Sequence, residues 1–411
     1  MKFEFFIARR MMSSKHYKSS VSAPIIKIGI GAIALGMIVM LISVATSAGL
    51  QREIRNKIIA YKGHITISHF DGNRSDESLL PLDLTDLLLR QLDSVEGISS
   101  YYFEANKFGI VRTENDFEGV VFKGLDKQFD WDKFNGYLLE GRLPVVGDSL
   151  TNEILISQYL SNRLGLRTGD PLFMYFLRED ENRPPAQRKF DIVGVINSGF
   201  QDLDATYLLG DLRHVQILNK WTPNQVGEIV VMAGDFDQLD LLNERIYQNI
   251  SFDLDSRTVV QQHAEIFEWI SIFDQNTQMI LVIMILVAGI NMVTALLVLI
   301  LERTPMIGLL RALGGQSHSL QKIFLLNAAH LIGWGLLFGN LIGLSLLFIQ
   351  QFFGIIPLDP SVYYVTEVPI HFNFFHWIYL NLGVFVLSML MLLIPSNIVR
   401  KVSPVTAMGF R

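Results

Sequence analysis

The chain has 411 residues, of which 50% are hydrophobic and 18% are charged, and its mean hydropathy is +0.33. A soluble protein averages about 25% charged residues, so part of this chain is expected to lie in lipid. The net charge of −6 argues against a nucleic-acid-binding protein, and the absence of cysteine excludes disulfides, thiol catalysis and cysteine-based zinc sites.

Four apolar runs are long enough to cross a bilayer, whose hydrocarbon core needs about 20 apolar residues. We therefore predict four transmembrane helices, at residues 25–48, 279–301, 323–353 and 377–395. The first run starts late and is long for a secretory signal, so we expect it to remain in the mature protein.

Charge predicts the orientation of these helices. The segments 1–27, 302–322 and 396–411 together hold 12 basic and 2 acidic residues, whereas 49–278 and 354–376 hold 22 basic and 38 acidic residues. The positive-inside rule then places both termini and the 302–322 connector in the cytoplasm, and 354–376 becomes a periplasmic loop.

The N-terminal part combines a cytoplasmic segment with a closely packed first span. Residues 1–24 mix aromatic and basic side chains, which predicts an amphipathic helix on the membrane surface. Ala32 and Gly36 have the spacing of small residues that let helices approach closely. Residues 29–34 also fit a dinucleotide-binding fingerprint, but no strand precedes them, so helix packing is the favoured interpretation.

Residues 49–278 are long enough to fold around a core of their own. Two β-α-β patterns, at about 60–113 and 224–262, predict a split βαβ core. Residues 114–222 resemble short strands with one helix over Asn152–Leu164, which predicts an inserted β-rich subdomain. The predicted fold class is therefore an α-helical membrane protein with a large extracytoplasmic α+β domain.

The flanks of this domain continue the neighbouring spans as amphipathic stripes, which predicts helical stalks. From Gln261 to Leu301 the pattern fits one continuous helix of 41 residues. A helix of that length is about 60 Å long, twice the hydrocarbon thickness. Two separate helices with a break near Asn276 are the alternative.

The connector 302–322 has clear helix start and stop signals. Thr304 is a suitable N-cap, Pro305 suits the first helical position, and Gly314 with Gly315 supplies the stop. The helix between them either lies on the membrane or docks on a cytoplasmic partner.

One side of this short helix is apolar, and Arg311 lies on the opposite side. The apolar residues at helical spacing are Met306, Leu309, Leu310 and Leu313. This stripe could fill a groove on another protein.

The third span contains Gly335, Gly339 and Gly343, whose four-residue spacing predicts a stripe against which another helix packs. His330 is ionisable within the same span and is a functional hypothesis for that reason, although a position near the interface is the favoured alternative. No predicted span contains Asp or Glu to complete a proton relay.

Motifs of enzymes are missing from the sequence. It contains no H-E-x-x-H, no G-x-S-x-G and no G-x-x-x-x-G-K-[ST]. We therefore expect no catalytic residue, no metal site, no cofactor and no ATP hydrolysis by this chain.

Several segments resemble a known family. Phe6-Ile-Ala-Arg-Arg10, Gly29-Ile-Gly-Ala-Ile-Ala-Leu-Gly36, Gly49-Leu-Gln-Arg-Glu-Ile-Arg55 and Gly63-His-Ile-Thr-Ile-Ser68 resemble the opening of lipoprotein-releasing (Lol-type) ABC transporter permeases. The four-span layout with one very large first loop is shared with macrolide-exporter and cell-division permeases, and the length of the chain favours the Lol branch.

Two further segments carry the same resemblance. Glu302-Arg303 with Ile307-Gly-Leu-Leu-Arg-Ala-Leu-Gly314 resembles the family's cytoplasmic coupling segment, and Leu358-Asp-Pro-Ser-Val-Tyr-Tyr364 resembles its last outer loop. The residues predicted to couple to an ATPase are Glu302, Arg303, Met306, Ile307, Gly308, Leu309, Leu310, Arg311, Leu313 and Gly314.

The resemblance implies a permease subunit in a bacterial inner membrane that transmits ATP-driven motion and releases lipoproteins to a periplasmic carrier. Its implied partners are a separate cytoplasmic ABC ATPase dimer, a second permease subunit of the same or another kind, the lipoprotein substrate and membrane lipid. A permease of the macrolide-exporter or hydrolase-activating type, which moves no lipoprotein, is the first alternative. A membrane-anchored sensor or adhesion domain is the second.

Overall fold

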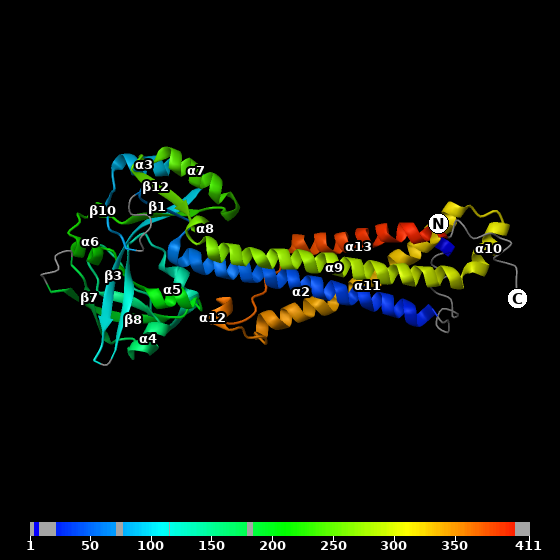
Figure 1. Ribbon diagram of the computed structural model, residues 1–411, viewed down its shortest axis with the longest axis horizontal. Coiled ribbons are helices and arrows are strands. Elements are labelled where there is room, and N and C mark those ends of the chain that lie inside the picture. Colours follow the sequence, from blue (N-terminus) through cyan, green and yellow to red (C-terminus); the bar gives the residue numbers. More distant parts are fainter. Residues whose placement is uncertain (1–3, 8–21, 71–76, 115, 179–183, 399–411) are drawn as a thin grey trace. The chain divides into compact units, whose positions relative to one another are not determined.

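The computed structural model describes residues 4–7, 22–70, 77–114, 116–178 and 184–398. Most of the predicted N-terminal amphipathic helix and most of the C-terminal tail lie outside these residues. The chain forms two compact units (Figure 1). The membrane unit comprises the chain up to Gln51, from Trp269 to Pro357 and from Glu367 onward, and the β unit comprises Arg52–Glu268 and Leu358–Thr366.

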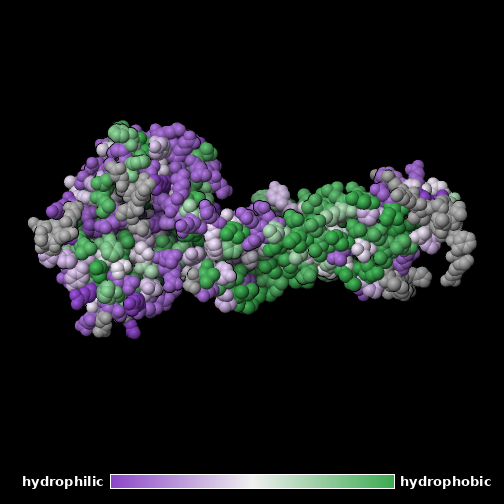
Figure 2. Space-filling model, in the orientation of Figure 1, coloured by the Kyte–Doolittle hydropathy of each residue, from purple (hydrophilic) through white to green (hydrophobic). Residues whose placement is uncertain are grey.

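Four helices of the described chain are long and apolar enough to cross a membrane. They are α2 (Ser22–Lys62), α9 (Ala264–Glu302), α11 (Ser317–Phe353) and α13 (Phe374–Ser396). Figure 2 shows a mostly hydrophobic surface over the helices of the membrane unit. Both α2 and α9 extend without interruption past the predicted spans and into the sequence of the β unit, so α9 has no break at Asn276.

The core of the membrane unit is made by large side chains of these helices. Ile33 and Met37 of α2 pack with Phe324 and Ile332 of α11, and all four are fully buried. The short helix α10 (Thr304–Ala312), which connects α9 to α11, adds its buried Ile307 to the same cluster.

One part of the β unit is a four-stranded antiparallel arrangement with two helices. Its strands are β1 (Ile65–His69), β3 (Ile98–Arg112), β11 (Glu228–Ala233) and β12 (Leu254–Thr258), in the order β12-β1-β11-β3. Helix α3 (Asp86–Asp93) connects β1 to β3, and α7 (Leu239–Asn249) connects β11 to β12. Each β-α-β connection therefore joins parallel strands that are separated by one antiparallel strand, which is the split arrangement.

The other part of the β unit is a closed ring of strands. The far half of β3 pairs with β4 (Phe117–Leu125), and the sheet continues through β9 (Tyr207–Asp211), β6 (Glu153–Ser157) and β8 (Ala186–Ile196). Strand β7 (Pro171–Phe176) pairs with both β8 and β3 and closes the ring. Strand β5 (Leu138–Gly141) pairs with β8 outside it. Phe122, Phe176 and Phe190 are fully buried inside it, and the Phe122 ring stacks on Phe190 with centroids 4.9 Å apart and meets Phe176 edge-on.

One prediction for the region 114–222 needs correction. The strands of this region share one ten-stranded sheet with the four-stranded part, because β3 belongs to both. The helix predicted over Asn152–Leu164 is half strand: β6 ends at Ser157, whose hydroxyl accepts from Leu160 N and caps α4 (Gln158–Leu164). The three consecutive apolar residues 154–156 are all buried, as in a strand covered on both faces.

Shorter elements complete the described chain. They are β2 (Leu82–Asp83), η3 (Trp131–Tyr137), α5 (Gln201–Thr206), α6 (Arg213–Asn219), β10 (Gln225–Val226), η4 (Phe236–Gln238), α8 (Val259–Gln262) and α12 (Pro360–Tyr363).

Candidate functional site

The connector helix α10 begins and ends close to the predicted positions. Its N-cap is Arg303 rather than Thr304, and the Thr304 hydroxyl instead donates to Ile300 O at 3.1 Å. The helix ends at Ala312, and Gly314 follows in the left-handed region with φ 90°. Gly315 N donates to Leu310 O at 2.8 Å, which satisfies a carbonyl at the end of the helix. The connection is therefore a defined helix with a tight stop.

The buried face of α10 differs from the predicted apolar stripe. Ile307 and Gly308 are its buried residues, and Met306 and Leu310 pack against the core of the membrane unit. Only half of the predicted stripe, Met306 and Leu310, contributes to this face. The spacing identified an apolar helix correctly but could not show that the face centred on Ile307 turns inward.

The opposite face of α10 presents two leucines to the outside. Leu309 is 54% exposed and Leu313 is 76% exposed, although both are large and apolar. Arg311 does not project from this face as an isolated charge, because its guanidinium donates to Ser317 Oγ at 2.6 Å. Glu302 and Gly314 are exposed at the two ends of the connector. This arrangement suits insertion of Leu309 and Leu313 into a groove of another protein.

The glycine stripe of α11 lies directly against α2. A β-carbon added at Gly335 would come within 2.7 Å of Ile33 Cβ, and one at Gly339 within 2.6 Å of Met37 Cβ. At Gly343 the nearest atom would be Leu41 Cδ1 at 3.0 Å. The three glycines therefore form a groove that accepts large side chains of α2.

The small residues predicted on the first span have a different neighbour. Gly36 is buried, and a β-carbon there would lie 3.8 Å from Met284 O of α9. Ala32 is partly buried. Gly36 thus lies on a face of α2 that contacts α9, while the large residues of α2 contact α11.

Amide side chains connect α11 to α13, a contact that no pattern in the sequence predicted. Asn340 Nδ2 donates to Asn381 Oδ1 at 2.6 Å, and Trp377 Nε1 donates to Asn340 Oδ1 at 2.7 Å. At the other end of the helix pair, Gln321 Nε2 donates to Ser396 Oγ at 2.8 Å. Polar contacts of this kind hold helices together in lipid, so α11 and α13 form a joined hairpin.

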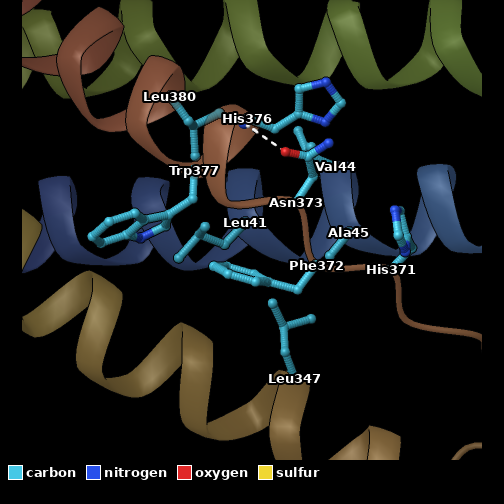
Figure 3. A pocket seen from close by; sticks show the side chains of 10 residues that line it. All are labelled: Leu41, Val44, Ala45, Leu347, His371, Phe372, Asn373, His376, Trp377 and Leu380. Carbon is cyan, nitrogen blue, oxygen red and sulfur yellow. Dashed lines mark hydrogen bonds between the residues drawn. The ribbon is translucent and has the colours of Figure 1, made fainter.

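A small cavity lies between α2, α11 and α13 (Figure 3). Its volume is about 20 Å³, enough for roughly one water molecule. Leu41, Phe372 and Trp377 line it, and the rings of His371 and His376 lie farther out in Figure 3. This cavity is too small for an acyl chain.

His330 lies on the outer surface of α11, where its Nε2 accepts from Trp334 Nε1 at 2.9 Å. Among the residues that the structure describes, no group of three or more histidines and carboxylates could hold a metal ion.

The helical unit and the β unit together define the class of protein: a multi-pass permease with a large folded domain between its first two spans. Two family models match the chain. The model described as MacB-like periplasmic core domain matches residues 29–248, and the one described as FtsX-like permease C-terminal matches residues 278–404. The chain therefore belongs to the MacB/FtsX superfamily of permeases, as its resemblance to Lol-type permeases predicted.

Curated relatives extend this similarity to nearly the whole chain. The lipoprotein-releasing system transmembrane protein LolC of Neisseria meningitidis serogroup B is 22% identical and aligned over 89% of both chains. LolE of Haemophilus influenzae is 22% identical and aligned over 97% of both chains. Among solved structures, the periplasmic region of MacB from Actinobacillus actinomycetemcomitans is 17% identical, with a TM-score of 0.34, over 51% of this chain and 95% of that one.

Proposed function

We propose that this chain is the permease subunit of an ATP-driven transporter that releases lipoproteins from a bacterial inner membrane to a periplasmic carrier. The observation that supports this function is the alignment, almost from end to end, with proteins named as lipoprotein-releasing system transmembrane proteins. The four long helices can cross the membrane, and the β unit is a separate folded domain, as this function requires.

In this proposal ATP is hydrolysed on a separate cytoplasmic chain. The exposed side chains of Leu309 and Leu313 dock on that ATPase. Both termini face the cytoplasm, and the β unit faces the periplasm. A second permease subunit, of the same or another kind, completes the transporter. Each acyl CH₂ that leaves the bilayer costs about 0.8 kcal/mol, so lipoprotein release needs an energy source such as ATP-driven movement.

Depletion of this chain in its own host tests the function. Lipidated proteins should accumulate in the inner membrane within a few generations, and re-expression of the chain should restore their normal distribution. Unchanged distribution of lipoproteins after depletion would contradict the proposal. If efflux of a small molecule failed instead, the macrolide-exporter alternative would be favoured, which the MacB-like match over residues 29–248 keeps in consideration.

A further inference from the structure

The outer connection between α11 and α13 is divided between the two units. Residues Leu358–Thr366 group with the β unit, although the chain on both sides groups with the membrane unit. Leu358 N donates to Thr366 O at 2.9 Å, and Tyr364 N donates to Pro360 O at 3.1 Å after the single turn of α12. The connection is therefore an ordered loop rather than a slack linker.

A hydrogen-bonded cluster in the β unit contacts this loop. The carboxylate of Asp204 accepts from Ser198 Oγ at 2.7 Å, from Ser198 N at 3.1 Å and from Tyr61 OH at 2.8 Å. Phe200 N donates to Ser198 Oγ at 3.0 Å, and the Phe200 side chain is only 1% exposed. These bonds fix the position of the Phe200 ring.

Tyr364 joins the loop to the β unit in two ways. Its ring stacks on Phe200 with centroids 4.4 Å apart and planes 14° apart, a favourable offset-stacking geometry. Its carbonyl accepts from Lys57 Nζ at 3.0 Å, and Lys57 is buried on the part of α2 that belongs to the β unit.

The backbone at this contact is unusual. Tyr364 has φ 58°, a left-handed conformation that a bulky residue adopts only where its surroundings require it. Opposite it, Gly199 has φ 71°, and a β-carbon there would lie 3.1 Å from Lys57 Nζ. The left-handed backbone of Tyr364 directs its carbonyl oxygen toward Lys57 Nζ. Glycine at position 199 leaves room for the lysine side chain.

We propose that Lys57, Phe200 and Tyr364 form an outer tie that fastens the α11–α13 hairpin to the β unit throughout the transport cycle. The inference rests on the proposed function and adds a role that the coupling helix does not supply. The hairpin is already joined internally by its amide contacts. A hairpin that is tied at its outer loop moves together with the β unit, so Tyr364 is a positioning residue for transport.

The first experiment compares two neighbouring tyrosines in the purified transporter, reconstituted with its ATPase. Tyr364→Ala should lower the amount of lipoprotein released per ATP hydrolysed by roughly tenfold while ATPase activity changes less than about twofold, because motion no longer reaches the hairpin. Tyr363→Ala is the matched control, since Tyr363 is 37% exposed and outside the stack. Tyr364→Phe keeps the ring and should behave as the unaltered chain. Equal effects of Tyr363→Ala and Tyr364→Ala would overturn the tie.

The second experiment uses the absence of cysteine in the sequence. A Phe200→Cys, Tyr364→Cys double variant lacks the stack, and a short bismaleimide should join the two positions in high yield both with and without ATP. The crosslink should restore the release lost in the double variant, with each single-cysteine variant as control. A low yield in either nucleotide state, or inhibition by the crosslink, would overturn a permanent tie. If the unaltered chain releases no lipoprotein, the proposed function fails, and the crosslinking yield still decides the tie.

Discussion

Gly339 of α11 faces Met37 of α2 so closely that a β-carbon on the glycine would lie 2.6 Å from Met37 Cβ and 2.9 Å from Ala34 O. One of these neighbours is backbone, which cannot rotate away as a side chain can. The two helices are therefore fixed at a separation that only glycine permits at this position. In lipid, where helices gain nothing from leaving water, such close packing is a main source of association.

Gly339→Ala should destabilise the protein by about 1–3 kcal/mol, because the added methyl group overpacks a filled contact. Gly339→Leu should prevent assembly of the membrane unit. Thermal unfolding in detergent measures both effects. Gly333→Ala is the matched control, since a β-carbon there meets no atom within 4 Å, and Leu337→Ala alters a residue that is 54% exposed. Similar losses in the controls would show that the glycine groove is incidental.

Leu309→Asp combined with Leu313→Asp should abolish recovery of the ATPase in a pull-down while the protein still inserts and folds. Both side chains are exposed, and a charge in an apolar groove should weaken binding a hundredfold or more, equivalent to about 3 kcal/mol. Leu310→Asp is not a clean test, because Leu310 packs against the membrane core and its loss affects folding. Normal ATPase recovery by the double variant would mean that α10 only rests on the membrane.

Single cysteines introduced into the cysteine-free chain should report opposite compartments. Lys127→Cys, at a side chain 61% exposed in the β unit, should react with an impermeant maleimide in intact spheroplasts. Leu313→Cys, at a residue 76% exposed on the connector that the charge distribution predicts to be cytoplasmic, should react only after lysis. Reaction of both cysteines from the same side would contradict the four-span topology.

Burial raises the pKa of Asp126 from 3.8 to about 6, although backbone N–H groups, including that of Phe103, oppose the shift. The protonated form is favoured in the folded state, so the stabilisation is complete below pH 3.8 and is lost as the pH rises through 6. Asp126→Asn should therefore raise the free energy of unfolding at pH 7.5 by at most about 3 kcal/mol and change it little near pH 4. Urea unfolding followed by tryptophan fluorescence measures this free energy. An equal effect of the substitution at both pH values would contradict a raised pKa of Asp126.

His64 should change the pH dependence of stability in the opposite direction, since its folded-state pKa is lowered. Burial, together with Lys133 and Arg55, lowers its pKa from 6.5 to about 4, so the neutral ring is favoured in the folded state. Its contribution is complete above pH 6.5 and is lost as the pH falls through 4. The neutral Nδ1 accepts from Ala233 N at 3.2 Å, a bond that an asparagine oxygen could also accept. His64→Asn should thus reduce the loss of stability between pH 6.5 and 4, and an unchanged pH profile would contradict it.

Properties that depend on local sequence were predictable, whereas contacts between distant residues were not. Length and hydropathy predicted the spans, and cap residues predicted α10 to within a residue or two of its observed bounds. The periodicity of α10 could not distinguish Ile307 as its most buried side chain, because both faces of the helix are apolar. The helical period assigned to residues 152–157 was wrong, since a continuous apolar run fits a buried strand equally well.

The outer tie is an example of contacts between distant residues, which the sequence could not predict. Lys57 and the Tyr364 carbonyl that it contacts are 307 positions apart, and nothing in the sequence around either residue points to the other. The resemblance of residues 358–364 to a family loop marked the segment but gave no partner for it. Only the fold brings Lys57, Phe200 and Tyr364 together.

The closed ring of β3, β4, β9, β6, β8 and β7 has a consequence for transporters that contain two such chains. Each of these strands is hydrogen-bonded on both sides over at least part of its length, so none of the six is an edge strand along its whole length. A strand edge with unpaired N–H and C=O groups can hydrogen-bond to a strand of a neighbouring copy and so join the two sheets. If the transporter contains two such chains, as proposed above, we therefore expect their rings to contact each other through side chains rather than through an added strand.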